Sequence, residues 1–111
     1  MNREDRKAAI AAYRERKVPA GIYAVRCAAV PTPWIGAAPN LDMIRNRIWF
    51  TLRHGSHTNP AMQAAWLSHG AESFRLEILE VLPEEDVAYV RGRLLKERLT
   101  HWRAVLDAPA A

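Results

Sequence analysis

The sequence predicts an α+β domain in which a small three-stranded antiparallel sheet is flanked by helices, with an extra helix at the N-terminus. Two short strand-like segments, "GIYAVRC" at residues 21–27 and "WIG" at 34–36, stand on either side of a Pro-Thr-Pro break. This spacing is typical of a hairpin. The segment "SFRLEILEVL" alternates apolar and polar side chains and predicts a third, half-buried strand.

The remaining segments predict helices, because their boundaries carry capping residues. Residues 3–17 are highly charged with a thin apolar stripe, and we expect residues 1–19 to form a helical arm beside a domain at 20–108. Asn40 is a suitable N-cap for a helix that ends near His54, and "TNPAMQAAWLSHG" has Pro near its start and Gly at its end. After Pro83, "EEDVAYVRGRLLKERLTHWRAVLDA" predicts a long helix with acids in its first turn.

Size and composition indicate a single small domain. The chain has 111 residues, of which half are apolar and a quarter charged. Its one cysteine, Cys27, cannot form an internal disulfide, which favours a reducing compartment such as the cytoplasm. A membrane span needs ~20 apolar residues in succession, and we find no such stretch and no signal-peptide core. We therefore expect a soluble, cytoplasmic protein with no membrane partner.

The charge balance points toward a polyanionic partner. Sixteen Lys and Arg residues oppose twelve acids, which gives a net charge of +4. Binding of cationic side chains to phosphate groups is favoured by counterion release, and the guanidinium group of arginine can donate two hydrogen bonds to phosphate oxygens. The four tryptophans offer stacking surfaces for bases, although core packing is the commoner use of such side chains.

Several motifs occur in an order that resembles the GIY-YIG nuclease superfamily. "GIY" at 21–23, "WIG" at 34–36, "NL" at the next helix start, "GSHTN" at its end, "HG" at 69–70 and "FRLEILE" all fall in the family's sequence. The resemblance covers roughly residues 20 to 106. It implies a phosphodiesterase fold in which a divalent metal, Mg²⁺ or Mn²⁺, and basic residues act on a nucleic-acid backbone.

The resemblance also implies roles for single residues, with clear departures from the family pattern. Tyr23 matches the family's first catalytic tyrosine, whereas Trp34 replaces the second, and His57 matches a family histidine after the helix. The helix positions of the family's arginine and histidine fall on Ile44 and Ile48. At the second tyrosine position, Trp34 would offer a stacking face. Arg45 is the nearest substitute for the family's arginine. The family's metal-binding position falls at or beside Arg93, and Glu97 is the acid nearest to it.

The apolar helix positions have a structural explanation. At ~100° per residue, Leu41, Ile44, Ile48 and Leu52 share one face, so we expect both isoleucines to be buried in the core. We also expect the Tyr23 hydroxyl to face an open pocket beside Trp34, because a purely structural tyrosine would more often bond its hydroxyl locally.

Three functions remain open from the sequence. The first is a nuclease with a rearranged site that uses Tyr23, Arg45 and His57, with the metal at Glu97. The second is an inactive nuclease fold that binds nucleic acid, DNA rather than RNA, through basic and aromatic residues: Trp34, Arg47, Arg53 and Lys96. The third is a protein-interaction module whose N-terminal helix docks on a partner, and the sequence leaves the oligomeric state open.

Overall fold

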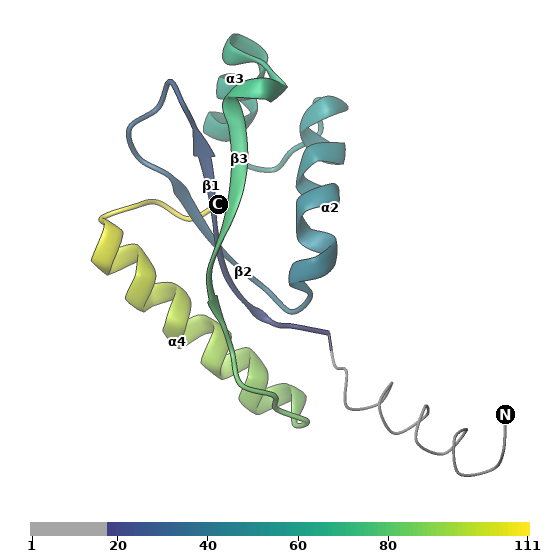
Figure 1. Cartoon of the computed structure of the whole chain (residues 1–111), viewed down its shortest axis with the longest axis vertical. Coiled ribbons are helices and arrows are strands. Elements are labelled where there is room, and N and C mark those ends of the chain that lie inside the picture. The colour runs from purple at the N-terminus through teal and green to yellow at the C-terminus, as the bar shows by residue number, and fades with distance from the viewer. Residues whose placement is uncertain (1–17) are drawn as a thin grey trace, which may run out of the picture.

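The computed structural model describes residues 18–111, so the helix expected within residues 3–17 lies outside the described part. Two strands come first, followed by two helices, a 3₁₀ turn, a third strand and a long helix (Figure 1). The elements are β1 (Gly21–Cys27), β2 (Trp34–Ala38), α2 (Leu41–Arg53), α3 (Pro60–His69), η1 (Ala71–Ser73), β3 (Phe74–Val81) and α4 (Ala88–Leu106).

The three strands form one antiparallel sheet with β1 in the centre, in the order β2-β1-β3. This confirms the predicted hairpin and the predicted sheet. In the hairpin register Tyr23 lies opposite Gly36, and on its other side Tyr23 pairs with Ile78. The pairing of β1 with β3 shifts between Ile22 and Tyr23, which is a bulge-like irregularity that increases local twist.

Alternation along β1 divides the domain into two apolar layers. Ile22 and Ala24 belong to the layer that α4 covers, whereas Tyr23 and Val25 belong to the layer that α2 and α3 cover. Figure 1 shows α4 on one side of the sheet and α2 on the other. The helix α4 packs into its layer through Leu95, Leu99, Trp102 and Leu106.

The two middle helices begin and end where the capping residues predict. The Asn40 side chain accepts a hydrogen bond from the backbone N–H of Met43 at 3.1 Å, and His54 caps the other end of α2. The Asn59 side chain accepts from the backbone N–H of Met62 at 3.1 Å, and α3 ends at Gly70 with φ 83°. Side-chain caps of this kind satisfy backbone donors that the helix itself leaves unpaired.

The start of the long helix differs from the prediction. The helix α4 begins at Ala88, and the acids after Pro83 precede it instead of occupying its first turn. The Glu85 carboxylate accepts a hydrogen bond from the backbone N–H of Val87 at 3.0 Å. This local side-chain bond competes with helical hydrogen bonding, and it explains the later start.

The apolar stripe of α2 is buried only in part. Ile48 and Leu52 are buried, with 5% and 1% exposure, and both belong to the core on the Tyr23 side of the sheet. Ile44 is half-buried and packs against the edge of that core. The prediction was therefore correct for Ile48 and too strong for Ile44, which lies where the core opens toward solvent.

The last residues of the chain run back along the edge of the sheet. After α4, Asp107 adopts a left-handed conformation with φ 49° and turns the chain. The backbone of Ile35 donates to Pro109 at 2.9 Å and accepts from Ala111 at 2.8 Å, in a parallel bridge. The Asn59 side chain also donates to the Ala110 carbonyl at 3.1 Å. Residues 109–111 thus cover the outer edge of β2, a contact that no sequence pattern predicts.

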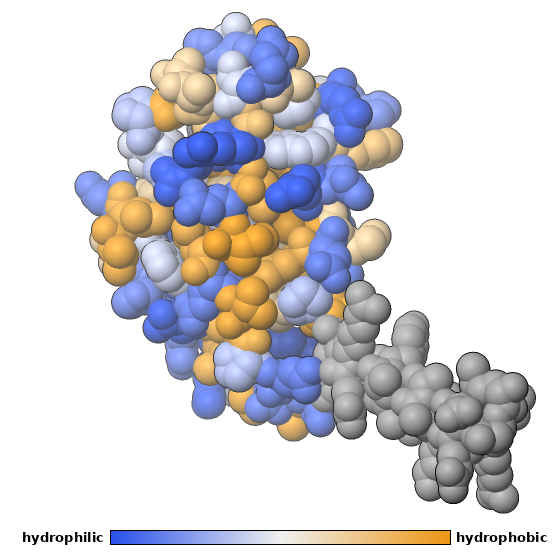
Figure 2. Space-filling view, viewed as in Figure 1, coloured by the Kyte–Doolittle hydropathy of each residue, from blue (hydrophilic) through white to orange (hydrophobic). Residues whose placement is uncertain are grey.

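At the opposite side of the sheet, β3 pairs with β1 along one edge only, and its outer edge has no strand partner among residues 18–111. Figure 2 shows apolar surface gathered in the middle of this side of the molecule, and Ile78 and Val81 are 42% and 57% exposed there. Among the described helices, none is both long and apolar enough to cross a membrane.

Truncating Ile48 should destabilise the domain more than truncating Ile44. We expect Ile48→Ala to lower the free energy of unfolding by about 2–5 kcal/mol, because it leaves a cavity in the core. Ile44→Ala, with part of its side chain already in solvent, should cost less than half as much. Urea denaturation of both variants measures the difference, and equal losses would contradict the observed burial.

Candidate active site

An open cleft of about 380 Å³ lies beside Tyr23, on the side of the sheet that α2 covers. Its walls come from β1, from one face of α2, from the loop between α2 and α3, and from the end of the C-terminal segment. The lining residues are Tyr23, Ile44, Arg47, Ile48, Thr51, Ser56, His57, Thr58 and Ala111.

Tyr23 enters this cleft across the neighbouring strand. A Cβ atom on Gly36 would overlap the Cζ and Oη atoms of Tyr23, so the phenol lies directly over the glycine. The ring is buried, with 6% exposure, and burial raises the pKa of the Tyr23 phenol above its ordinary value of 10.0. Its hydroxyl has no hydrogen-bond partner among residues 18–111. Every fully buried side-chain oxygen in that part of the chain does have a partner, so the Tyr23 hydroxyl is not fully buried. The hydroxyl is therefore open to the cleft, and it is protonated at neutral pH.

His57 is held at the opposite wall by contacts with two helices. Its ring Nδ1 lies 2.8 Å from the Thr51 hydroxyl on α2. Its backbone N–H donates to the Gln63 side chain on α3 at 3.2 Å, and Gln63 in turn donates to the Leu52 carbonyl at 3.0 Å. Burial lowers the pKa of the His57 imidazole below its ordinary value of 6.5, which keeps the ring neutral at pH 7.

The arginine at the cleft is not the one that the helical pattern favoured. Arg47 lines the cleft with Tyr23 and His57. Arg45 instead lines a separate groove between α2 and β3, together with Asp42 and Ile78. The structure thus places Arg47 at the Tyr23 cleft and Arg45 at the separate groove, and the role expected for Arg45 stays a prediction.

Trp34 has a different position from the one expected. It is 5% exposed, and its ring stacks on Phe74 with 6.3 Å between centroids and 5° between planes. It does not line the Tyr23 cleft. The ring belongs to the core on this side of the sheet and exposes little surface on which a base could stack.

The residues expected on the long helix lie away from the cleft. Glu97 is exposed on α4 and faces Arg93 at 3.9 Å, and Lys96 is its exposed neighbour. The helix α4 packs on the side of the sheet opposite Tyr23. Arg53, at the end of α2, is exposed and donates to the Trp49 carbonyl at 3.3 Å. Of the expected site residues, the structure brings together Tyr23, Arg47 and His57.

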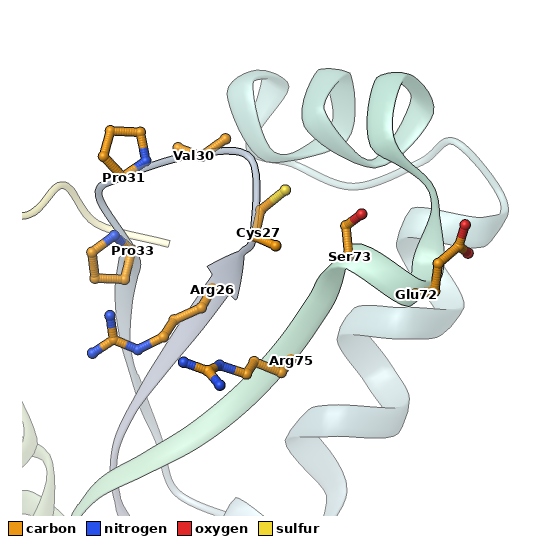
Figure 3. A pocket seen from close by; sticks show the side chains of 9 residues that line it. Arg26, Cys27, Val30, Pro31, Pro33, Glu72, Ser73 and Arg75 are labelled. Carbon is orange, nitrogen blue, oxygen red and sulfur yellow. The ribbon is translucent and has the colours of Figure 1, made fainter.

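A second hollow, of about 460 Å³, lies at the end of the β1–β3 pair. Figure 3 shows Arg26 and Arg75 beside each other there, and they are opposite one another in the strand register. The Arg26 guanidinium pairs with Glu77 at 2.8 Å, and Glu72 also lines the hollow. The acids therefore offset part of the positive charge of the two arginines.

Comparison with solved structures identifies the architecture. The catalytic domain of intron endonuclease I-TevI, in a point-mutant form, aligns with a TM-score of 0.69 and 26% identity, over 81% of this chain and 86% of that chain. A second structure, of the catalytic domain of homing endonuclease I-TevI, aligns with a TM-score of 0.67 and 26% identity, over 79% and 88%. The chain has a GIY-YIG-like nuclease fold. No family model and no curated protein matches its sequence.

On this GIY-YIG-like fold, two cleft features escaped the sequence analysis. Thr51 contacts the imidazole of His57, and Ala111 lines the cleft. Thr51 lies in the last turn of α2 and His57 in the loop that follows, so no helix or strand periodicity connects them. Ala111 reaches the cleft only through long-range pairing with Ile35.

Replacing Gly36 with alanine should displace Tyr23 from the cleft. The new methyl group would occupy the space of the phenol, and backbone on the central hairpin cannot yield easily. We expect Gly36→Ala to lower the midpoint of thermal unfolding and to increase the exposure of Tyr23 in solvent-perturbation spectra.

Gly92→Ala is the matched control, since an added Cβ there meets nothing within 4 Å on the exposed side of α4. It should leave Tyr23 unchanged and stabilise the helix by up to about 1 kcal/mol. A Gly36→Ala protein as stable as the wild type would show that Tyr23 does not lie over Gly36.

Proposed function

We propose that this domain hydrolyses phosphodiester bonds of nucleic acid, DNA rather than RNA, in the cleft formed by Tyr23, Arg47 and His57. The observation that supports this most strongly is the meeting of these three side chains on a fold shared with an endonuclease catalytic domain. Hydrolysis needs a group that activates water, a group that protonates the leaving oxygen, and a cation that offsets phosphoryl charge.

The environments of His57 and Tyr23 support the first two tasks in this proposal. His57 is neutral at pH 7 and can accept a proton from water, whereas Tyr23 is protonated and can donate one. The water oxygen forms a bond to phosphorus while its proton passes to His57. The P–O bond to the leaving oxygen then breaks, and that oxygen takes the Tyr23 proton. Solvent returns a proton from the imidazolium to the phenolate, so the cycle is balanced.

Arg47 supplies the cation in this proposal. It lies at the same cleft on α2, and a guanidinium offers several N–H donors to the oxygens of one phosphate. The apolar side chains of Ile44 and Ile48 form the wall next to it. An apolar wall strengthens the interaction of a cation with phosphate, because it excludes part of the screening water.

The cleft does not fit the divalent metal that nucleases of this fold generally require. Mg²⁺ and Mn²⁺ prefer carboxylate oxygens, and no Asp or Glu is among the residues that line the cleft. Glu97, the expected ligand, lies on α4 across the sheet, and no cluster of three metal-ligating side chains occurs within residues 18–111. The steps proposed above therefore use the side chains of the chain alone.

The absence of Asp and Glu side chains from the cleft lining also favours a second candidate function, binding of nucleic acid without cleavage. In this case Arg47 and the neighbouring cations of α2 contact phosphates, and Tyr23 has no chemical task. The N-terminal segment, residues 1–17, lies outside the described part, so the protein-interaction function stays a prediction.

Cleavage should depend on pH with two limits set by the cleft. The rate constant kcat/KM should rise through the pKa of His57, below 6.5, and should fall only through that of Tyr23, above 10.0. We expect Tyr23→Phe to lower the rate by ~10²-fold and to remove the alkaline limit, and His57→Gln to remove the acidic limit. Gel assays on labelled single- and double-stranded DNA and RNA, with and without Mg²⁺, measure this. No cleavage of any substrate would favour binding alone.

Binding should weaken steeply with salt, whichever of the two functions holds. Neutralising a phosphate contact reduces the slope of log K against log[salt] by about one. We expect this reduction for Arg47→Gln and none for Lys96→Gln, because Lys96 lies on the opposite side of the sheet. Fluorescence anisotropy with a labelled duplex measures both slopes, and equal effects would mean that the cleft is not the binding surface.

A further inference from the structure

We infer that Thr51 is a positioning residue that fixes the tautomer of His57, with the proton on Nδ1 and the lone pair of Nε2 open to the cleft. The inference rests on the proposed function only where it gives His57 the task of a base. The tautomer itself follows from the contacts around the ring.

The hydrogen bonds of the Thr51 hydroxyl indicate which ring nitrogen of His57 carries the proton. A threonine hydroxyl has one proton, and Thr51 donates it to the backbone carbonyl of Ile48 at 2.9 Å. The same oxygen lies 2.8 Å from Nδ1 of His57. Because the hydroxyl proton is already used, the bond forms only if Nδ1–H donates to the threonine oxygen. The neutral ring then has its lone pair on Nε2.

Other contacts hold the His57 loop and the Thr51 side chain in position. The His57 backbone is tied to Gln63, and Gln63 is tied to the end of α2 at Leu52, so the loop that carries the ring is fixed to both helices. Thr51 is half-buried, and its β-branched side chain has restricted rotamers in a helix. The hydroxyl is therefore held in place before any substrate binds.

The second ring nitrogen of His57, Nε2, has no protein partner in the described part of the chain. All fully buried side-chain nitrogens among the described residues are hydrogen-bonded, so Nε2 is accessible to solvent. The charged or titratable side chains that line the same cleft are Arg47 from α2 and Tyr23 from β1. A neutral ring with the opposite tautomer would present an N–H to this space and could not accept a proton from water.

The tautomer can be measured without any cleavage. Two-bond ¹H–¹⁵N spectra of the full chain at pH 8 should show His57 with a protonated Nδ1 and an unprotonated Nε2. We expect Thr51→Val, which keeps the shape and removes the acceptor, to shift the neutral ring toward the Nε2–H form. Thr51→Ser should restore the wild-type pattern. In the cleavage assay Thr51→Val should lower kcat about tenfold or more with little change in KM.

Thr100→Val is the matched control. Thr100 makes a similar bond to its own helix, at 3.0 Å to the Lys96 carbonyl, but it lies on α4 away from His57. It should leave the His57 spectrum and the cleavage rate unchanged.

Two outcomes overturn the inference: an Nε2–H tautomer in the wild type, or a Thr51→Val spectrum identical to the wild type. If the spectra show the expected tautomers but neither the wild type nor any variant cleaves nucleic acid, the positioning role of Thr51 stands and the nuclease function is rejected. Spectra of the wild type decide the first point even if Thr51→Val fails to fold.

Discussion

The pairing of Tyr23 with Gly36 is the constraint on which the cleft depends. The antiparallel register sets these residues opposite each other, and the missing side chain of the glycine leaves room for the phenol to lie across β2. A slip by one residue would turn every side chain of β1 to the other face. Tyr23 would then point at α4 and away from His57, so the register of one hairpin decides whether a site exists.

The same alternation keeps the chemistry of the two sides apart. On the α4 side, Glu80 accepts hydrogen bonds from Trp102 at 2.8 Å and from Arg98 at 2.7 Å. These bonds, with the nearby charge of Arg98, lower the pKa of the Glu80 carboxyl. This carboxylate is thus committed to fixing α4 on the sheet. The acids of this side serve the structure, and none of them lines the Tyr23 cleft.

The sequence predicted the fold better than the site, for physical reasons. Strand alternation, Asn caps and glycine stops are local signals, and they gave the sheet and the bounds of α2 and α3. The Glu85 turn that delays α4 competes with an equally local helix signal, so the pattern alone could not decide it. Motif order predicted Tyr23 and His57 at the site. The burial of Trp34 could not be predicted from a local pattern, because its stacking partner, Phe74, is forty residues away in the chain.

Isoleucine at the two helix positions where the family carries an arginine and a histidine changes the polarity of the cleft wall. By the resemblance, Ile44 and Ile48 stand where relatives carry an arginine and a histidine, and both now form an apolar wall. Apolar walls remove water from neighbouring groups, and loss of water favours the neutral forms of imidazole and phenol alike. The pKa of His57 is lowered and that of Tyr23 is raised by burial, in opposite directions. The apolar wall thus favours a neutral base and a protonated acid at the same pH, while Arg47, one turn along the helix from Ile44, retains a positive charge at the edge of the cleft.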